Sequence, residues 1–179
     1  EKSKLISYVP QKIEQINDIL VKDYLTFGFV NQINFFSEPS NEQYKSILIK
    51  AKEFKVEQFL ERKLGELSGG QQKLIYIIGA LLQNSETIIL DEPIAALDLN
   101  KESLILNTLK EIQKNENKTI ILSTHDPNHV NTLNANAILM KDGKIIDYLE
   151  NNEPIFNKIE DLKKIYNSNL YIDKTIKSK

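Results

Sequence analysis

Two stretches decide the fold that the sequence predicts: Leu67-Ser68-Gly69-Gly70-Gln71 and, about twenty residues later, Ile88-Ile89-Leu90-Asp91-Glu92-Pro93. The first precedes a run, 72–83, in which apolar residues recur at the spacing of a helix with one buried face. Serine is a favoured helix N-cap, and glycines leave backbone N–H groups open to an anion. The second stretch is an apolar strand that ends in two adjacent carboxylates. Together the two stretches predict a site for phosphate and a divalent cation.

The two carboxylates can act at one site only if the chain bends between them. Successive side chains of an extended strand point to opposite sides, which would separate Asp91 from Glu92. Pro93 follows directly and favours a bend. The structural alternative for the pair is solvated charge at the surface.

The remaining apolar patterns predict an alternation of strands and helices. A short buried strand is expected over 5–9, a parallel strand over 118–123, and a hairpin around Asp142-Gly143. Residues 12–63 are predicted to be mainly helical, and an apolar stripe runs over 13–20. A helix is expected to begin at 40–43, with an apolar face that includes Leu48 and Phe54. A short helix is expected over 56–64. Further helices are expected over 100–113 and 153–166. His129 is expected on a helix surface.

Composition limits the function classes. The 179 residues suffice for one hydrophobic core, and 23 basic against 25 acidic residues leave a net charge of −2, with no sign of a nucleic-acid surface. The chain has no cysteine, which excludes disulfides and thiolate metal sites. The longest apolar segment, 74–82, is shorter than the roughly 20 residues that span a bilayer. Any association with a membrane is therefore expected to be mediated by a partner protein.

At these motifs the chain resembles the ATP-binding subunits of ABC transporters. Residues 67–71 resemble their signature motif, 87–93 their Walker B strand and 95–98 their D-loop. Residues 123–126 are similar to their H-loop, and 8–11 to their Q-loop. The five motifs follow the family's order and spacing, and the resemblance covers about 4–150. It implies an α/β fold of P-loop NTPase type, with a mainly parallel sheet, flanking helices and a helical subdomain.

The resemblance also implies a role for each motif residue. The signature residues Ser68, Gly69, Gly70 and Gln71 would bind the terminal phosphate of an ATP molecule held by the opposite subunit of a dimer. A helix N-terminus suits this task because its unpaired N–H groups carry partial positive charge. From the residues alone, an ordinary N-capped helix remains an alternative.

The other motifs would complete the nucleotide site. Asp91 would orient Mg²⁺, Glu92 would be the general base, and Gln11 would contact Mg²⁺ and the γ-phosphate. His125 would contact the γ-phosphate as a catalytic residue, and Asp98 would bind at the dimer interface that connects two ATP sites. Taken singly, Gln11 could be a surface loop residue, His125 a structural histidine and Asp98 a helix N-cap.

One family motif is absent from the sequence. No Gly-x-x-x-x-Gly-Lys-[Ser/Thr] occurs, and the six glycines stand at 28, 65, 69, 70, 79 and 143. That loop holds the β- and γ-phosphates of ATP, and the resembled family places it before the Q-loop. We therefore expect the C-terminal part of one ATPase domain, without the N-terminal strands and P-loop and inactive by itself. Its parts would be a helical subdomain at 12–66, a RecA-like core at 1–11 and 67–150, and a C-terminal helix and tail at 151–179.

For the parent protein the resemblance implies ATP hydrolysis in a homodimer with ATP and Mg²⁺ as cofactors. The partners would be transmembrane permease subunits and, indirectly, an extracellular or periplasmic substrate-binding protein, with the subunit cytoplasmic and peripheral on the inner face of the cell membrane. Stretches 6–11, 21–28, 124–129 and 160–166 most resemble importers of iron-siderophore, haem or cobalamin, with manganese or zinc importers close behind. Two alternatives stay open: a non-hydrolysing docking or dimerisation module, and a soluble ABC-type ATPase of DNA repair or translation.

Overall fold

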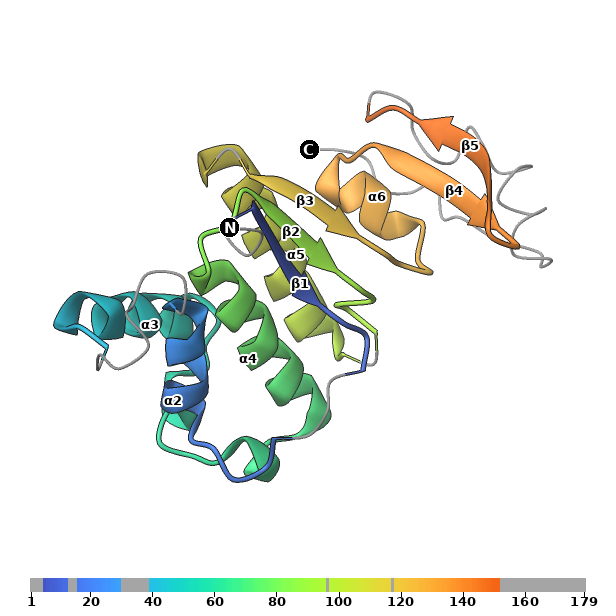
Figure 1. The fold of residues 1–179 in the computed structure, drawn as a ribbon. Helices are drawn as coiled ribbons and strands as arrows, with labels where there is room; N and C mark the ends of the chain where they lie inside the picture. The colour runs from blue at the N-terminus through green and yellow to red at the C-terminus, as the bar shows by residue number, and fades with distance from the viewer. Residues whose placement is uncertain (1–4, 13–15, 30–38, 96, 117, 152–179) are drawn as a thin grey trace. The chain divides into compact units, whose positions relative to one another are not determined.

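The computed structural model describes residues 5–12, 16–29, 39–95, 97–116 and 118–151 (Figure 1). The chain divides into two compact units, 1–125 and 126–179. The first unit contains a parallel sheet with its helices, and the second contains a short helix and a hairpin. The predicted division into a helical subdomain and a RecA-like core stays a prediction.

A parallel sheet is the framework of the first unit. Its described strands are β1 (Ile6–Val9), β2 (Thr87–Leu90) and β3 (Thr119–Leu122), in the spatial order β1-β2-β3. The register sets Val9 opposite Leu90, and Leu90 opposite Leu122, so the three carboxyl ends are level. This arrangement confirms the predicted α/β fold with a mainly parallel sheet.

The strands differ in burial. In the middle strand, Ile88 and Leu90 are buried, as expected for an apolar run that is covered on both faces. The prediction of a fully buried strand at 5–9 was wrong on one face, because Ile6 and Tyr8 are each about half exposed. Among the described strands β1 pairs on one side only, and its alternate residues are buried.

Two long helices flank the sheet (Figure 1). Helix α4 (Gly69–Leu82) is buried without a break from Leu74 to Leu82, and α5 (Leu99–Glu116) buries Ile105, Leu106, Leu109 and Ile112. Both helices were predicted from the apolar periodicity, and their existence is confirmed. The expectation that α4 buries only one face was wrong, because its residues from Leu74 to Leu82 are buried on every side.

A group of shorter helices packs beside α4 (Figure 1). It comprises α2 (Val21–Thr26), a 3₁₀ turn at Phe27–Phe29 and α3 (Asn41–Glu53), which Ser40 caps as predicted. Gly28 allows the close approach to α4, since a Cβ there would lie 2.7 Å from the Cβ of Leu82. The Tyr24 ring packs edge-on against Tyr76 of α4, with centroids 5.3 Å apart.

The mainly helical prediction for 12–63 was wrong in two segments. Residues 16–20 carry a helical stripe but are not helical, because Ile19 and Asn17 accept backbone hydrogen bonds from Leu64 and Gly65. Segment 56–64 contains no α-helix; its region forms 3₁₀ turns at Glu57–Phe59 and Leu64–Glu66. Leu48, expected on the buried face of α3, is 46% exposed, whereas Phe54 is buried as expected. Residues 13–15 and the aromatic residues Phe35 and Phe36 lie outside the described residues.

The second unit contains α6 (Asn128–Leu133) and an antiparallel hairpin of β4 (Ala137–Lys141) and β5 (Lys144–Leu149). Asp142 and Gly143 both have positive φ, at 51° and 73°, as the tight turn of a hairpin requires. The hairpin prediction is confirmed. His129 was wrongly expected on a helix surface: it is buried, and its Nε2 lies 3.7 Å from the Asp126 carboxylate, which provides a polar partner for the ring. The helix predicted at 153–166 lies outside the described residues.

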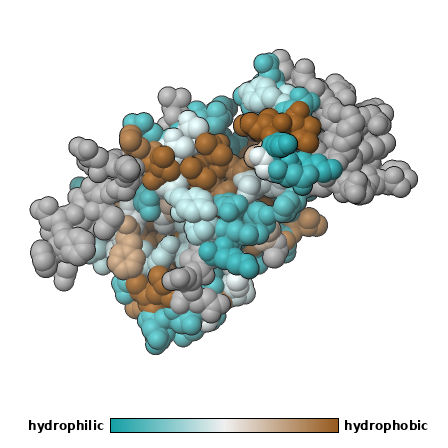
Figure 2. Space-filling model, turned by 45° about the vertical axis from the view of Figure 1, so that its right-hand side comes forward, coloured by the Kyte–Doolittle hydropathy of each residue, from teal (hydrophilic) through white to brown (hydrophobic). Residues whose placement is uncertain are grey.

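Figure 2 shows hydrophobic areas separated by hydrophilic ones on one face of the molecule. Within the described part of the chain, no helix combines the length and the apolar character that crossing a membrane requires.

Candidate functional site

The candidate site lies where the three parallel strands end. Level carboxyl ends bring the residues that follow each strand to one edge of the sheet, the usual ligand side of an open α/β sheet. The Asp91 N–H donates to the Val9 carbonyl at 2.9 Å, and the Ser123 N–H donates to the Leu90 carbonyl at 3.0 Å. These bonds extend the pairing one residue beyond the strands and fix the starting points of the loops.

The chain turns sharply at Glu92. Its φ is +46°, a left-handed conformation that costs a non-glycine residue on the order of 1–3 kcal/mol. The Glu92 N–H donates to Ser123 Oγ at 2.8 Å, and the Glu92 carbonyl accepts a hydrogen bond from Lys73 Nζ. The expected bend is thus present at Glu92 itself, with both ends of the residue held.

The Glu92 carboxylate is clamped between two residues from other strand ends. Gln11 Nε2 donates to Oε2 at 2.5 Å, and His125 Nε2 pairs with Oε1. The Glu92 side chain is 16% exposed, whereas that of His125 is 80% exposed. The arrangement orients a sheltered carboxylate and leaves one partner accessible to a ligand.

The Asp91 carboxylate lies beside this clamp. The Ser123 hydroxyl donates to Asp91 Oδ1 at 2.6 Å, and the Tyr8 hydroxyl lies 3.5 Å from Oδ2. The Asp91 carboxylate, the Ser123 hydroxyl and the side-chain oxygen of Gln11 are hard oxygen donors. Such donors suit Mg²⁺, which keeps several of its waters when it binds to a protein. Glu92, Gln11 and His125 are therefore in direct contact as expected, and Asp91 is linked to Glu92 through Ser123, whose hydroxyl also accepts a hydrogen bond from the Glu92 N–H.

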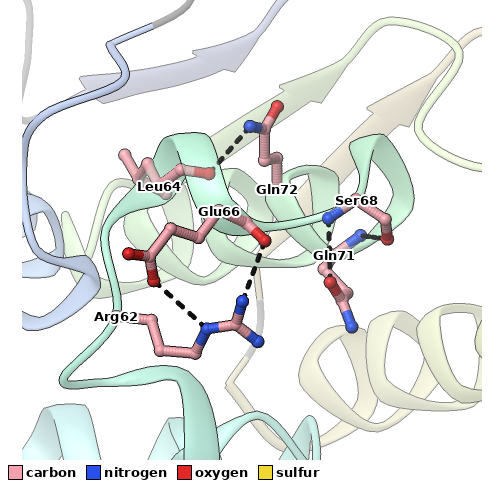
Figure 3. A network of polar contacts seen from close by, with 6 residues as sticks. All are labelled: Arg62, Leu64, Glu66, Ser68, Gln71 and Gln72. Carbon is pink, nitrogen blue, oxygen red and sulfur yellow. Dashed lines mark hydrogen bonds and ion pairs between the residues drawn. The ribbon is translucent and has the colours of Figure 1, made fainter.

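The signature stretch forms a reinforced helix start (Figure 3). The Ser68 N–H donates to Gln71 Oε1 at 2.8 Å, and the Gln71 N–H donates to Ser68 Oγ at 3.4 Å, a reciprocal capping box. Gln72 Nε2 donates to the Leu64 carbonyl at 2.8 Å, which ties the preceding turn to α4. Ser68 is nevertheless exposed, so its cap role leaves the hydroxyl accessible.

The two signature glycines have different surroundings. A Cβ at Gly69 would meet no atom within 4 Å, whereas one at Gly70 would lie 3.0 Å from the Leu97 side chain. Gly69 therefore faces open space at the helix start, and Gly70 allows the Leu97 loop to approach. Open space in front of unpaired N–H groups is what an anion requires.

Asp98 is bonded to Lys101 and not to the carboxylate cluster. Its Oδ1 accepts from the Lys101 N–H at 3.0 Å, and its Oδ2 pairs with Lys101 Nζ at 2.5 Å. The hydrogen bond from Lys101 lowers the pKa of the Asp98 carboxyl below its ordinary value. The N-cap interpretation is thus confirmed, and the dimer-interface role stays a prediction.

Comparison with known proteins identifies the family. Residues 3–131 match the family model described as "AAA domain, putative AbiEii toxin, Type IV TA system", more than half of the chain, which is thus a member of that AAA-domain family. The chain is 29% identical over 170 residues to a probable iron chelatin transport ATP-binding protein of Helicobacter pylori, covering 95% of this chain and 66% of the relative. It is 35% identical over 147 residues to the manganese transport system ATP-binding protein MntB of Halalkalibacterium halodurans, covering 81% and 58%.

Solved structures agree in fold. The structure "An inward-facing conformation of a putative metal-chelate type ABC transporter" matches with a TM-score of 0.77 and 27% identity, over 91% of this chain and 64% of that one. A dimeric bacterial ABC transporter cassette matches with a TM-score of 0.76 and 26% identity, over 85% and 65%. The chain belongs to the ABC transporter ATP-binding domains. This ATP-binding domain spans 66% and 58% of the length of the two curated relatives named above.

Sequence reasoning missed three residues of the site. Ser123 and Tyr8 lie within the stretches similar to the H-loop and the Q-loop, but the resemblance implies no role for either residue. One feature of the sequence could have pointed to Lys73: it is a basic residue directly before the apolar run of α4. Burial lowers the pKa of Lys73, against the opposing effect of Glu92 and Asp91, which favour its charged form.

Proposed function

We propose that the protein hydrolyses ATP as the nucleotide-binding subunit of an ABC importer. The observation that carries the proposal is the Glu92 carboxylate, held by Gln11 and His125 and lying beside Asp91. Two donors fix the direction of a sheltered carboxylate, as a general base for an attacking water requires.

Each residue of the cluster then has a distinct task. Glu92 accepts the proton of the attacking water, and the accessible His125 contacts the γ-phosphate. Asp91 and Gln11 hold Mg²⁺, in part through water. The metal ion, when bound, neutralises charge on the phosphate oxygens. Ser123 orients Asp91 through its hydroxyl, since that hydrogen bond is only 2.6 Å long.

The second part of the proposal is a homodimer in which residues 68–71 of one copy bind ATP held by the other. The open space around Gly69 and the exposure of Ser68 support it, because a ligand can reach the helix start from outside. Asp98 would lie at the same interface. Transmembrane permease subunits, with a substrate-binding protein acting through them, would place the protein peripherally on the inner face of the membrane.

The transported substrate is proposed to be a metal ion or a metal chelate. The relatives named for iron chelatin and manganese transport support this class, as does the metal-chelate type transporter of similar fold. An iron chelate is the first substrate to test, since the iron chelatin relative matches 95% of the chain.

The test is ATP turnover by the protein that the complete reading frame encodes, measured against Mg²⁺ concentration. Asp91→Asn should raise the Mg²⁺ needed for half-maximal rate by about tenfold or more, because groups around a metal typically contribute 10–100-fold. Asp142→Asn is the matched control, since asparagine tolerates the left-handed turn there. Unchanged Mg²⁺ dependence in Asp91→Asn contradicts the metal role. A folded wild-type protein without turnover contradicts the proposed function and favours the docking module.

A further inference from the structure

A cation that contacts the carboxylate cluster comes from the signature helix. Lys73 follows the Ser68 cap by five residues, in the second turn of α4. Its Nζ donates to the backbone carbonyl of Glu92, across 19 residues of sequence, in a partly buried position. One side chain thus connects the helix that begins with the signature motif to the residue proposed as general base.

The contact acts at a residue whose backbone conformation is unfavourable by itself. Glu92 has a left-handed backbone, and its N–H is already held by Ser123 Oγ at 2.8 Å. Its carbonyl accepts from Lys73 and, at the longer distance of 3.3 Å, from the Ala95 N–H. A residue held at both its N–H and its carbonyl has a fixed Cα–Cβ direction, and this direction decides where its carboxylate lies.

Two opposing effects act on the charge of Lys73 at this position. The carboxylates of Glu92 and Asp91 attract its ammonium, whereas burial opposes the charge. A donor that is charged forms a stronger hydrogen bond to a carbonyl than a neutral one does. The aliphatic stem is meanwhile available to pack along α4.

We propose that Lys73 is a positioning residue that holds the backbone of Glu92 in its left-handed turn and so aligns the general base with the signature helix of the same chain. The inference rests on the proposed ATPase function. Lys73 itself touches no reacting atom. Its loss should change the geometry of the base while leaving the groups that bind nucleotide in place.

The experiment measures kcat and KM for ATP in the protein of the complete reading frame, with wild type, Lys73→Met, Lys73→Arg and Lys45→Met. Lys73→Met keeps a stem of similar length and removes the donor. We expect kcat to fall about tenfold or more, since small misplacements of reacting groups cost up to about 100-fold, with KM changed less than about threefold. Lys73→Arg should recover most of kcat, because it retains a charged donor. Lys45→Met, on the exposed side of α3, should equal wild type.

The outcomes separate the two proposals. No turnover in wild type contradicts the ATPase function and leaves Lys73 no base to position. Turnover in wild type with an unchanged kcat in Lys73→Met overturns the positioning role alone. Equal losses in kcat in folded Lys73→Met and Lys73→Arg also overturn it. If Lys73→Met fails to fold, the kcat of folded Lys73→Arg is compared with that of wild type. A near-normal kcat is expected, and a clearly reduced kcat overturns the positioning role.

Discussion

The amide of Gln11 donates a 2.5 Å hydrogen bond to the carboxylate of Glu92, although 81 residues separate them in sequence. The contact exists because β1 and β2 are parallel neighbours with level ends. His125, which follows β3, holds the other oxygen of the same carboxylate. Three strand ends therefore converge on one side chain, and this convergence is the structural basis of the proposed ATPase function.

The two N-cap serines offer a matched test of the signature motif. Ser68 and Ser40 each form a capping box with a glutamine three residues later. Replacing either serine by alanine should lower the free energy of unfolding by about 1 kcal/mol, the usual contribution of an N-cap. Only Ser68→Ala should also reduce ATP turnover, by about tenfold or more, since hydrogen bonds to charged groups contribute about 1.5–3 kcal/mol. Equal turnover in both variants would contradict a phosphate-binding role for Ser68.

The packing of Gly28 against α4 predicts a stability effect. A Cβ at Gly28 would lie 2.7 Å from the Cβ of Leu82 and 2.9 Å from the Gly79 carbonyl oxygen. Because these atoms belong to or adjoin the backbone, Gly28→Ala should reduce the free energy of unfolding by about 1–3 kcal/mol, as overpacking does. Gly69→Ala is the control, since its Cβ would face open space. Denaturant unfolding measures both, and a Gly28→Ala variant as stable as wild type would show that the 3₁₀ turn at Phe27–Phe29 approaches α4 less closely.

Tyr24 predicts a loss of stability at alkaline pH. Burial raises the pKa of its phenol from 10.0 to about 12, so folding favours the protonated form. The stabilisation is complete below the unfolded pKa of 10.0 and is lost as pH rises through about 12. Tyr24→Phe should reduce the decline in unfolding free energy between these pH values, whereas Tyr44→Phe on α3 should not. Tyrosinate absorbance during an alkaline titration checks the pKa directly, and a phenol that titrates at its ordinary value contradicts the prediction.

The grouping of these residues was largely predictable, because the motifs that resemble those of ABC ATP-binding subunits follow strands that periodicity reveals. Asp91 and Glu92 follow an apolar run, and Gln11 and His125 follow two others, so a parallel sheet brings them together. The bend was also predictable from the neighbouring proline. These features depend on local sequence and on one general rule of sheet topology.

The features that could not be predicted depend on contacts between distant residues. The Lys73 contact with Glu92 depends on the direction of a long side chain, which periodicity does not report. Residues 16–20 carry a helical pattern, but Leu64 and Gly65 donate backbone hydrogen bonds to them, and this tertiary pairing overrides the local preference. Gly65 permits the approach, because a Cβ there would lie 2.9 Å from the Asn17 Cβ.

The most direct test of the account replaces the proposed general base. Glu92→Gln retains the size and polar contacts of the side chain but removes the proton acceptor. In the protein of the complete reading frame, we expect ATP to remain bound with Mg²⁺ while turnover falls about 100-fold or more, the typical contribution of a general base. Glu57→Gln, exposed in a 3₁₀ turn, is the control and should match wild type. Bound ATP with lost turnover supports the account, and a Glu92→Gln variant that hydrolyses ATP at the wild-type rate contradicts it.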